Sequence, residues 1–494
     1  MPHADLLATL ENLAQPRVLV LGDLILDRYT WGNAERVSQE APVILLRADR
    51  REARLGGAAN VCQMLRGLEA KPSCFGVVGD DSDGAELRRM LADGGVDHAD
   101  LLPDASRPTT VKERFIGRAA NRHPHQILRV DHEVRDPLSA ALEDELASRI
   151  AARVNEFQVV LISDYDKGVC TPGLIAAVIR AAQARGIPVV VDPMRGGDYS
   201  RYHGATTMTP NRLETELATG LKIEKPQDAF AAGAQLCREL NLQSAIVTLD
   251  RDGMALVRPD GDGELFPTRP RKVYDITGAG DMVLATIGLA LAAGVSLEES
   301  VRLANVTGGL EVEQVGVVAI TREEVRVDLL RSGKGAAGGK VVTLEDAGDA
   351  ADAARALGRR VVFTNGCFDL LHVGHVTYLE EAATQGDLLI LGLNSDASVR
   401  ELKGPSRPVR KEAERAAILA ALSYVDFVVV FDKPTPMQLI ERIRPDVLVK
   451  GGDYRNKLDE ITGRELVESY GGVLYLAGMV EGVSTSQILR SLAA

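Results

Sequence analysis

The sequence predicts an α/β protein with two successive domains, each built on a doubly wound, largely parallel sheet. Short apolar runs typical of buried strands alternate with helical segments in both halves of the chain. At 494 residues the chain is too long for one ordinary core. A glycine-rich stretch without periodicity, residues 331–340, indicates a flexible linker. We therefore expect one domain at residues 1–330 and a second at residues 341–494.

Composition narrows the class of protein before any motif is considered. The hydrophobic content of 45% and charged content of 26% are ordinary for a globular protein, and the net charge of -13 argues against general binding to nucleic acid or to membrane surfaces. The five cysteines form no CxxC pair, which favours reduced thiols over a disulfide framework. The first residues show no secretory signal, and the longest apolar run is too short for a bilayer. We expect a cytoplasmic protein with no nucleic-acid or membrane partner.

The first half of the chain supplies the larger predicted sheet. A helix is expected near residues 174–185 between two of its strands. The expected strands are residues 18–23, 43–46, 126–130, 159–164, 188–192 and 245–249. Polar side chains follow several of these runs, namely Asp27, Asp164, Asp192, Asn211 and Asp250. Because ligands bind outside the carboxyl ends of strands in such sheets, we expect a cleft for a polar ligand at this edge.

Residues 275–281, Asp-Ile-Thr-Gly-Ala-Gly-Asp, predict a phosphoryl-transfer site. They lead into residues 282–293, which are apolar on every side and so predict a buried helix. Free backbone N–H groups at a helix start bind anions, and Gly278 and Gly280 let a phosphate approach without a Cβ in the way. Asp281 lies beside that anion site and can take the proton from an attacking hydroxyl. The alternative is an ordinary helix start with an aspartate cap.

Two further features of the first half favour binding of an anionic substrate. Small residues around Gly57 precede Asn60 at a predicted helix start, although close helix packing would also explain them. Residues 112–129 hold five cations against one acid, either as a solvated surface or as a patch for an anion. Arg129 is the best single candidate for that anion, because it alternates with apolar neighbours on a predicted strand and can point into the cleft.

Together, residues 56–60, 211–214 and 275–281 resemble the ribokinase-type sugar kinases, and the likeness covers roughly residues 15–320. The resemblance implies a ribokinase-like domain whose small β-lid includes the strands near 43–46 and 112–130. It also implies roles for individual residues. Asp281 would be the catalytic base, and Gly278, Ala279 and Gly280 would form the anion hole. Asn211 and Glu214 would contact Mg–ATP. The sugar contacts would be Asp27, Gly57, Asn60 and Arg129. Mg²⁺ would enter with ATP near Glu214, with no direct ligand assigned.

The second half predicts a smaller doubly wound sheet with its own phosphate site. Its expected elements are strands at 360–365, 388–391, 427–431 and 447–449 and a helix at 412–422. His372 and His375 stand three apart at a helix start, so both imidazoles share one face and can donate to phosphate oxygens. A metal pair and a purely structural pair are the alternatives, but metal-binding helices favour an i, i+4 spacing with an acid.

Residues 358–494 resemble the HxGH nucleotidylyltransferases of the cytidylyltransferase-like superfamily, which implies a Rossmann-like domain. By that resemblance His372 and His375 stabilise the transferring phosphate. The other implied nucleotide contacts are Asn365, Gly366, Phe368, Lys403, Arg415, Ser484, Thr485 and Ser486. The sequence departs from related glycerol-phosphate enzymes at Met479, where they carry an arginine.

The order of the two domains resembles the family of bifunctional heptose 7-phosphate kinases and heptose 1-phosphate adenylyltransferases. The resemblance implies ATP and heptose phosphates as substrates, Mg²⁺ as cofactor, an ADP-heptose as product and a homodimer formed through the kinase lid. Two alternatives are open. The fusion could act on another sugar or polyol phosphate, or the chain could be a non-catalytic sensor, although a sensor would have no need of Asp281 as a base.

Overall fold

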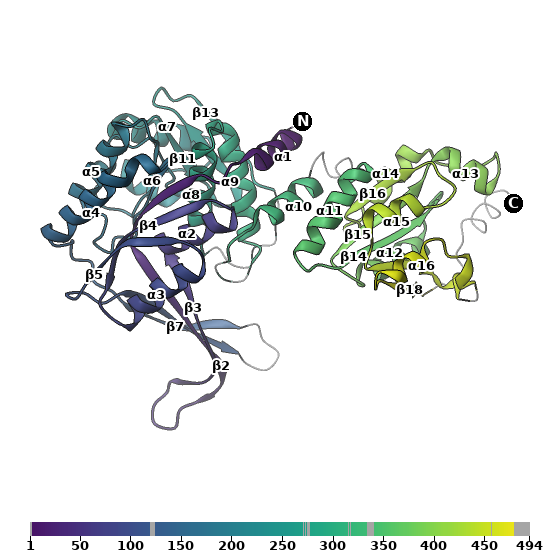
Figure 1. Ribbon diagram of the computed structural model, residues 1–494, viewed down its shortest axis with the longest axis horizontal. Helices are drawn as coiled ribbons and strands as arrows, with labels where there is room; N and C mark the ends of the chain where they lie inside the picture. The colour runs from purple at the N-terminus through teal and green to yellow at the C-terminus, as the bar shows by residue number, and fades with distance from the viewer. Residues whose placement is uncertain are drawn as a thin grey trace. The chain divides into compact units, whose positions relative to one another are not determined.

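The computed structural model describes residues 2–118, 124–269, 271, 273, 277–314, 316, 318–332, 340–455 and 457–478. The chain divides into two compact units (Figure 1). One unit is residues 12–322, and the other joins residues 323–494 to the N-terminal residues 1–11. The predicted boundary at residue 330 lies inside α10 (Arg322–Ser332), and most of the predicted linker, residues 333–339, lies outside the described residues.

A nine-stranded sheet forms the centre of the first unit, within the described residues, in the order β13-β12-β11-β10-β9-β8-β1-β4-β5. Its seven strands from β11 to β5 are parallel, and β12 and β13 add antiparallel strands at one edge. The strands are β1 (Arg17–Gly22), β4 (Lys71–Gly79), β5 (Asp97–Asp104), β8 (Val159–Ser163), β9 (Val189–Asp192), β10 (Thr207–Met208), β11 (Ser244–Thr248), β12 (Met254–Val257) and β13 (Gly263–Phe266). The predicted parallel sheet is confirmed.

Helices cover both faces of this sheet, which explains why its parallel strands are apolar on both sides. Leu19 and Leu21 point to the face that packs against α4 and α5. On the opposite face α8 approaches so closely that a Cβ at Gly288 would lie 2.4 Å from the side chain of Leu161. The helices are α2 (Ala58–Gly67), α3 (Ser82–Asp93), α4 (Ala140–Arg153), α5 (Pro172–Gln183), α6 (Arg212–Thr219), α7 (Asp228–Leu240), α8 (Ala279–Ala292) and α9 (Leu297–Glu311).

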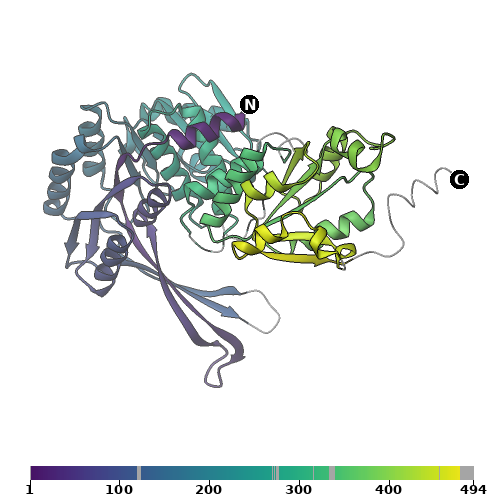
Figure 2. The ribbon, with the colours of Figure 1, turned by 45° about the vertical axis from the view of Figure 1, so that its right-hand side comes forward.

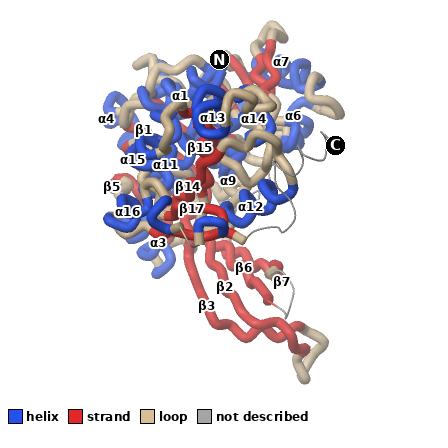
Figure 3. Tube along the Cα trace, turned by 90° about the vertical axis from the view of Figure 1, so that its right-hand side faces the viewer, coloured by secondary structure: helices blue, strands red, loops and turns tan. Residues whose placement is uncertain are grey.

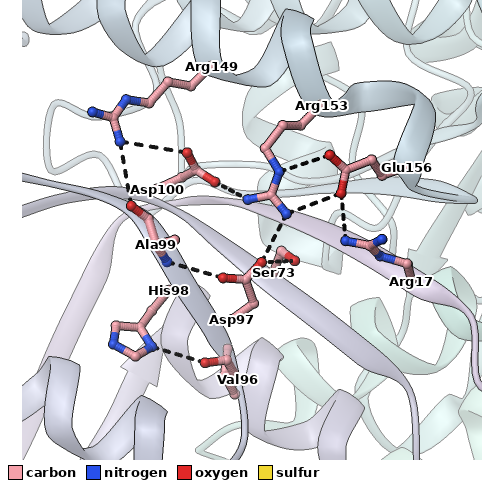
Figure 4. A network of polar contacts seen from close by, with 10 residues as sticks. All are labelled: Arg17, Ser73, Val96, Asp97, His98, Ala99, Asp100, Arg149, Arg153 and Glu156. Carbon is pink, nitrogen blue, oxygen red and sulfur yellow. Dashed lines mark hydrogen bonds and ion pairs between the residues drawn. The ribbon is translucent and has the colours of Figure 1, made fainter.

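A cluster of ion pairs fastens α4 to the edge strand β5 (Figure 4). Arg153, at the end of α4, pairs with Asp97 at 3.0 Å, with Asp100 and with Glu156 at 3.2 Å. These carboxylates hold the pKa of the Arg153 guanidinium above its usual value, against the effect of burial. Several partners around one guanidinium form a network, which stabilises more than isolated surface pairs do.

A second, four-stranded sheet forms the lid of the first unit and extends away from the main sheet (Figures 1 and 2). Its described strands lie side by side in the order β3-β2-β6-β7 (Figure 3). They are β2 (Leu24–Val37), β3 (Ile44–Gly57), β6 (Thr110–Arg118) and β7 (His125–His132). The predicted lid is confirmed, but the strand expected at residues 43–46 is only the outer end of the much longer β3.

The second unit holds a parallel sheet that is five-stranded in its described part, in the order β16-β15-β14-β17-β18. Phe363 packs in the cluster on the α11 and α15 face, and Val362 packs in the cluster on the α12 and α14 face. The strands are β14 (Val361–Gly366), β15 (Leu388–Asn394), β16 (Phe427–Phe431), β17 (Val447–Gly451) and β18 (Val473–Ala477). The main helices are α11 (Leu344–Ala356), α12 (Val373–Ala383), α13 (Asp396–Lys403), α14 (Glu412–Ala420), α15 (Met437–Ile443) and α16 (Arg464–Ser469). This arrangement confirms the second predicted sheet.

Two helices outside the predicted second domain belong to the same compact unit, α1 (Pro2–Asn12) and α10. Arg326 on α10 lies 3.6 Å from the carboxylate of Asp349 on α11 and 3.8 Å from that of Glu11. Glu324 lies 3.9 Å from the guanidinium of Arg359. These side chains are partly exposed, so each pair contributes little by itself.

Candidate active sites

The buried carboxylate of Asp281 lies in the first turn of α8, where side chains from three parts of the first unit converge. The Nδ2 of Asn60, on α2, donates to Asp281 Oδ2 at 2.6 Å. The hydroxyl of Tyr165, in the loop after β8, donates to Asp281 Oδ1 at 2.9 Å. Both oxygens are therefore held in place. Asn60 Oδ1 is buried without a hydrogen-bond partner among the described residues, and so it can accept a bond from a ligand.

Burial raises the pKa of Asp281 to about 6. The hydrogen bonds from Asn60 and Tyr165 oppose this rise, the negative charge of Asp27 adds to it, and the positive charge of Lys112 opposes it. A carboxylate with a pKa near 6 is ionised at neutral pH yet basic enough to accept a proton, as a general base requires. The predicted role of Asp281 fits this environment and stays a prediction.

The helix start beside Asp281 offers room for an anion. Gly278 adopts φ 99°, a left-handed conformation that glycine accepts without strain, and no side chain of a described residue caps the helix. Among the described residues, a Cβ built at Gly280 would meet only Asp192 Oδ2, at 3.8 Å. The described part of the chain therefore leaves the space over Gly280 open. The preceding residues Asp275 and Ile276 lie outside the described residues.

Asn211 and Glu214 form a reciprocal capping box at the start of α6. Asn211 Oδ1 accepts from the Glu214 N–H at 2.9 Å, and Glu214 Oε2 accepts from the Asn211 N–H at 2.8 Å. Burial raises the pKa of Glu214. Burial is also the main cause that raises the pKa of Asp192, and the negative charges of Glu214 and Asp281 raise it further. Glu214 and Asp192, both partly exposed, offer carboxylate oxygens of the kind that Mg²⁺ prefers. The residues present thus fit the Mg²⁺ that ATP carries.

A cavity of about 390 Å³ opens at the same end of α6. This size lies within the range of small-molecule sites. It is lined by Arg195, Asn211, Arg212, Leu213, Glu216 and Asp250. The cavity brings together Asn211 and Asp250, two of the polar residues that the sequence predicted at the ends of strands.

Of the predicted sugar contacts, Asn60 bonds Asp281, Asp27 lies close enough to affect the pKa of Asp281, and Gly57 directly precedes the helix that carries Asn60. Gly57 adopts φ 58°, and a Cβ there would lie 2.3 Å from Asp23 O, so this close turn requires glycine. Asp27 is buried and bonds the guanidinium of Arg114 on β6. Sequence reasoning missed the contact with Arg114, although Arg114 belongs to the basic segment it had singled out.

Arg129 lies farther out on the lid than predicted. It is directly opposite Arg114 in the β6–β7 pairing, but its side chain is 49% exposed and its Nε bonds Asp131 at 2.8 Å. Its apolar neighbour Leu128 is 54% exposed, so the alternation that favoured Arg129 does not mark a buried face. Lys112 reaches further in, with its Nζ 5.2 Å from the centre of the Tyr165 ring. The geometry favours Lys112 and Arg114 over Arg129 as partners of an anion near Asp281.

The two predicted histidines of the second unit lie together where β14 leads into α12. Their rings stack with centroids 3.9 Å apart, and both Nδ1 atoms are buried without a hydrogen-bond partner among the described residues. Burial, then the charges of His372 and Lys403, lower the pKa of His375 to about 4, and burial lowers that of His372. In the described ranges no third metal-ligating side chain completes a set with them. A phosphate would satisfy such donors and would favour their protonation.

The remaining predicted nucleotide contacts differ in how well they can reach a phosphate. Asn365 Oδ1 accepts from Lys450 at the end of β14, Phe368 packs 5.2 Å from the His375 ring, and a Cβ at Gly366 would crowd Phe368 at 2.9 Å. Lys403 ends α13 close enough to affect the pKa of His375. The predicted turn of Ser484, Thr485 and Ser486 lies outside the described residues, as does Met479.

Arg415 is built into the fold more deeply than a phosphate contact would be. Its side chain is fully buried, and its Nη1 donates to Cys367 O at 2.6 Å and to Asn394 O at 2.8 Å. Its Nη2 donates to Asp396 at 2.7 Å. This geometry favours a structural role, in which Arg415 fixes the loop after β14, over the phosphate contact expected from the sequence.

Comparisons with known proteins agree with this division of the chain. The pfkB family of carbohydrate kinases matches residues 15–324, and the cytidylyltransferase-like family matches residues 363–490. Two proteins named bifunctional protein HldE, from Geobacter metallireducens and Geobacter sulfurreducens, are 47% and 48% identical. Each alignment covers 96% of this chain and 95% of the relative.

Solved structures resemble the chain in fold. The structure of Arabidopsis thaliana ribokinase complexed with ribose and ATP matches with a TM-score of 0.51 and 21% identity, over 64% of this chain and 99% of that one. Phosphofructokinase-2 from Escherichia coli in complex with substrates and products gives 0.52 and 20%, over 63% and 97%. At these identities the likeness shows the fold alone, and it confirms the predicted ribokinase-like domain. With near-complete matches to the HldE proteins, the chain belongs to the family of bifunctional HldE proteins and joins a pfkB-type carbohydrate kinase domain to a cytidylyltransferase-like domain.

Proposed function

We propose that the chain is a bifunctional enzyme of ADP-heptose synthesis. The first unit transfers the γ-phosphoryl group of ATP to O1 of D-glycero-β-D-manno-heptose 7-phosphate. After a separate enzyme removes the 7-phosphate, the second unit joins heptose 1-phosphate to the AMP part of ATP and releases pyrophosphate. The observation that carries this proposal is the buried, doubly hydrogen-bonded Asp281 at an open helix start, because it supplies a base and an anion site together.

In the kinase step Asp281 takes the proton of the O1 hydroxyl as this oxygen bonds to the γ-phosphorus of ATP, and the bond to the ADP oxygen breaks. The N–H groups at the start of α8 hold the charge on the transferring group. The carboxylates of Glu214 and Asp192 would hold Mg²⁺, which would supply positive charge to the phosphates of ATP. General-base assistance of this kind contributes about 10²–10⁴-fold to the rate.

The 7-phosphate of the substrate needs a cation away from the reacting hydroxyl. Lys112 and Arg114 supply it from the strand of the lid that pairs with the Asp27 strand. Lys112 has no ion pair with a described carboxylate within 4.0 Å, whereas Arg114 is engaged with Asp27. Arg129 is the alternative contact for the 7-phosphate, and its guanidinium would have to break its ion pair with Asp131 to bind that phosphate.

In the adenylyl step an oxygen of heptose 1-phosphate bonds to the α-phosphorus of ATP while the bond to pyrophosphate breaks. His372, His375 and Lys403 face the same region and donate to the phosphate oxygens as charge moves to the leaving group. The Nδ1 atoms of both histidines are buried and have no hydrogen-bond partner among the described residues, which supports this role.

An assay of the purified chain with ATP and a panel of sugar phosphates tests the proposal, with ADP and pyrophosphate measured separately. We expect ADP with heptose 7-phosphate and pyrophosphate with heptose 1-phosphate. Turnover with another sugar or polyol phosphate and none with heptose phosphates would favour the alternative substrate. Binding without any turnover would favour the sensor.

A homodimer through the lid and a cytoplasmic location complete the proposal. The outer end of the lid exposes large apolar side chains, which a second copy could cover. They are Val37, Val43, Ile44, Leu45 and Leu128, and each is 46–66% exposed. Sedimentation of the wild type and of Ile44→Glu tests the dimer. ATP and heptose phosphates are cytoplasmic metabolites, and among the described residues no helix has the length and apolarity to cross a bilayer.

A further inference from the structure

Tyr165 contacts the proposed base but has no part in the chemistry described above. Its hydroxyl lies 2.9 Å from Asp281 Oδ1, although the two residues are 116 positions apart in the sequence. Burial, then the charge of Asp281, holds the pKa of the Tyr165 phenol well above its ordinary value. The phenol therefore keeps its proton and acts as the donor in this bond.

The loop that carries Tyr165 is fixed by its backbone rather than by the phenol. The N–H groups of Tyr165 and Lys167 donate to Asp23 Oδ2 at 2.8 and 3.0 Å, and that of Val169 donates to Asp23 Oδ1 at 3.1 Å. Asp23 is 1% exposed. Removing the hydroxyl of Tyr165 should consequently leave the loop in place, so its effect on Asp281 can be measured separately.

Charged groups from several elements surround the same carboxylate. Lys112 on β6 stands over the Tyr165 ring, Asp27 lies on β2, and Asp192 ends β9. Asp27 disfavours the ionised form of Asp281, whereas Lys112 favours it. The hydrogen bonds from Tyr165 and Asn60 also favour the ionised form of Asp281.

We propose that Tyr165 is a positioning residue that orients Asp281 and holds it in the charged, proton-accepting form during the kinase reaction. This inference rests on the proposed function, in which Asp281 is the base. A donor to a carboxylate stabilises the ionised form only, and protonation of the carboxylate weakens that bond. Losing one such bond shifts the protonation of the acid by about one pH unit or slightly more.

The test is the pH dependence of kcat/KM for the kinase reaction of the full chain carrying Tyr165→Phe. The acid limb of the profile should move up by about one pH unit, and the rate on the alkaline side should stay within about threefold of wild type. A merely structural role would lower the rate at every pH and leave the limb in place, and an unmoved limb overturns the proposal. Adenylyl transfer by the same protein reports whether the preparation is intact.

Tyr199→Phe is the matched control. Its hydroxyl also makes a buried hydrogen bond in the first unit, to Met194 O at 2.7 Å, but it does not contact Asp281. The acid limb should not move in this variant. An equal shift in both variants would mean that any buried phenol affects the profile, which also overturns the assignment.

Two further variants separate this inference from the proposed function. If Asp281→Asn still turns over heptose 7-phosphate, the base assignment fails and the proposed mechanism fails with it. If Asp281→Asn is inactive while Tyr165→Phe keeps the wild-type limb, only the role of Tyr165 is refuted. Should Tyr165→Phe not fold, 3-fluorotyrosine at position 165 gives a more acidic donor. The limb should then move down, and no movement or an upward movement contradicts the proposal.

Discussion

Replacing Asp281 with asparagine should inactivate the kinase and at the same time make the first unit more stable. The charged side chain is 3% exposed, so the folded protein holds an ion that the unfolded chain keeps in water. Asparagine has nearly the same shape and no charge. The free Oδ1 of Asn60 lets that amide turn and accept a bond from the new side chain.

The magnitude follows from the raised pKa. Folding raises the pKa of Asp281 from 3.8 to about 6, so the unfolded chain loses this proton first as the pH rises. Stability therefore falls between about pH 4 and pH 6, and the destabilisation reaches about 3 kcal/mol above that range, at about 1.4 kcal/mol per pKa unit. The Asp281→Asn variant has no charge at this position and therefore avoids this destabilisation. We expect a gain of about 1–3 kcal/mol at about pH 7.5 and of about 1 kcal/mol or less at about pH 4.5.

The single tryptophan makes this measurable in the intact chain. Trp31 lies on β2 of the lid, so its fluorescence reports the first unit during urea unfolding. Kinase turnover should fall by about 10²–10⁴-fold. ATP binding and adenylyl transfer should change little.

Three outcomes would refute this reasoning. One is a variant no more stable than wild type at about pH 7.5. Another is a gain of the same size at both pH values, since a charge effect must grow with ionisation. The third is ADP release within a few-fold of wild type, which would remove Asp281 from the role of base.

Other predictions concern the remaining site residues. His375→Ala should lower the kcat of adenylyl transfer by about 10²–10³-fold and leave kinase turnover unchanged; equal losses in both assays would indicate misfolding. Lys112→Ala should raise the KM for heptose 7-phosphate by about 10–100-fold, and Arg129→Ala by less than about threefold, with the KM for ATP constant in both. The opposite order of these two variants would restore Arg129 as the phosphate contact. Arg415→Met should destabilise the second unit by about 3–5 kcal/mol in urea, followed by circular dichroism, because it leaves Asp396 and three carbonyl groups without their donor. A raised KM for ATP in adenylyl transfer with unchanged stability would instead support the phosphate contact.

The parallel sheets could be predicted from the sequence because burial on both faces makes their strands continuously apolar. The runs at 159–164 and 427–431 show this, and both are strands. By contrast β2 and β3 were largely missed. Charged residues interrupt both sequences, along the mostly exposed Arg47–Arg54 of β3 and within the mostly buried β2, so neither gives an apolar run or a regular alternation.

The candidate sites were predictable only where a local motif carries the chemistry. The glycines before Asp281 and the histidine pair are motifs of that kind. The contacts of Asp281 with Asn60 and Tyr165 join residues 221 and 116 positions apart, so no local pattern encodes them. Arg415 shows the converse limit. A buried arginine and a phosphate-binding arginine look alike in a sequence, and only packing separates them.

The position of β3 at the edge of the lid has a consequence for how the protein behaves at high concentration. One side of its backbone has no partner strand in the described part of the chain, and such an edge can recruit a strand from another molecule. The charges along Arg47–Arg54 make that recruitment unfavourable over most of its length. Ile44 and Leu45 lack this protection and are 51% and 46% exposed. In molecules whose lid is not covered by a second copy, fibre-like association would therefore begin at this end, and neutralising the arginines of β3 should spread it along the strand and lower solubility.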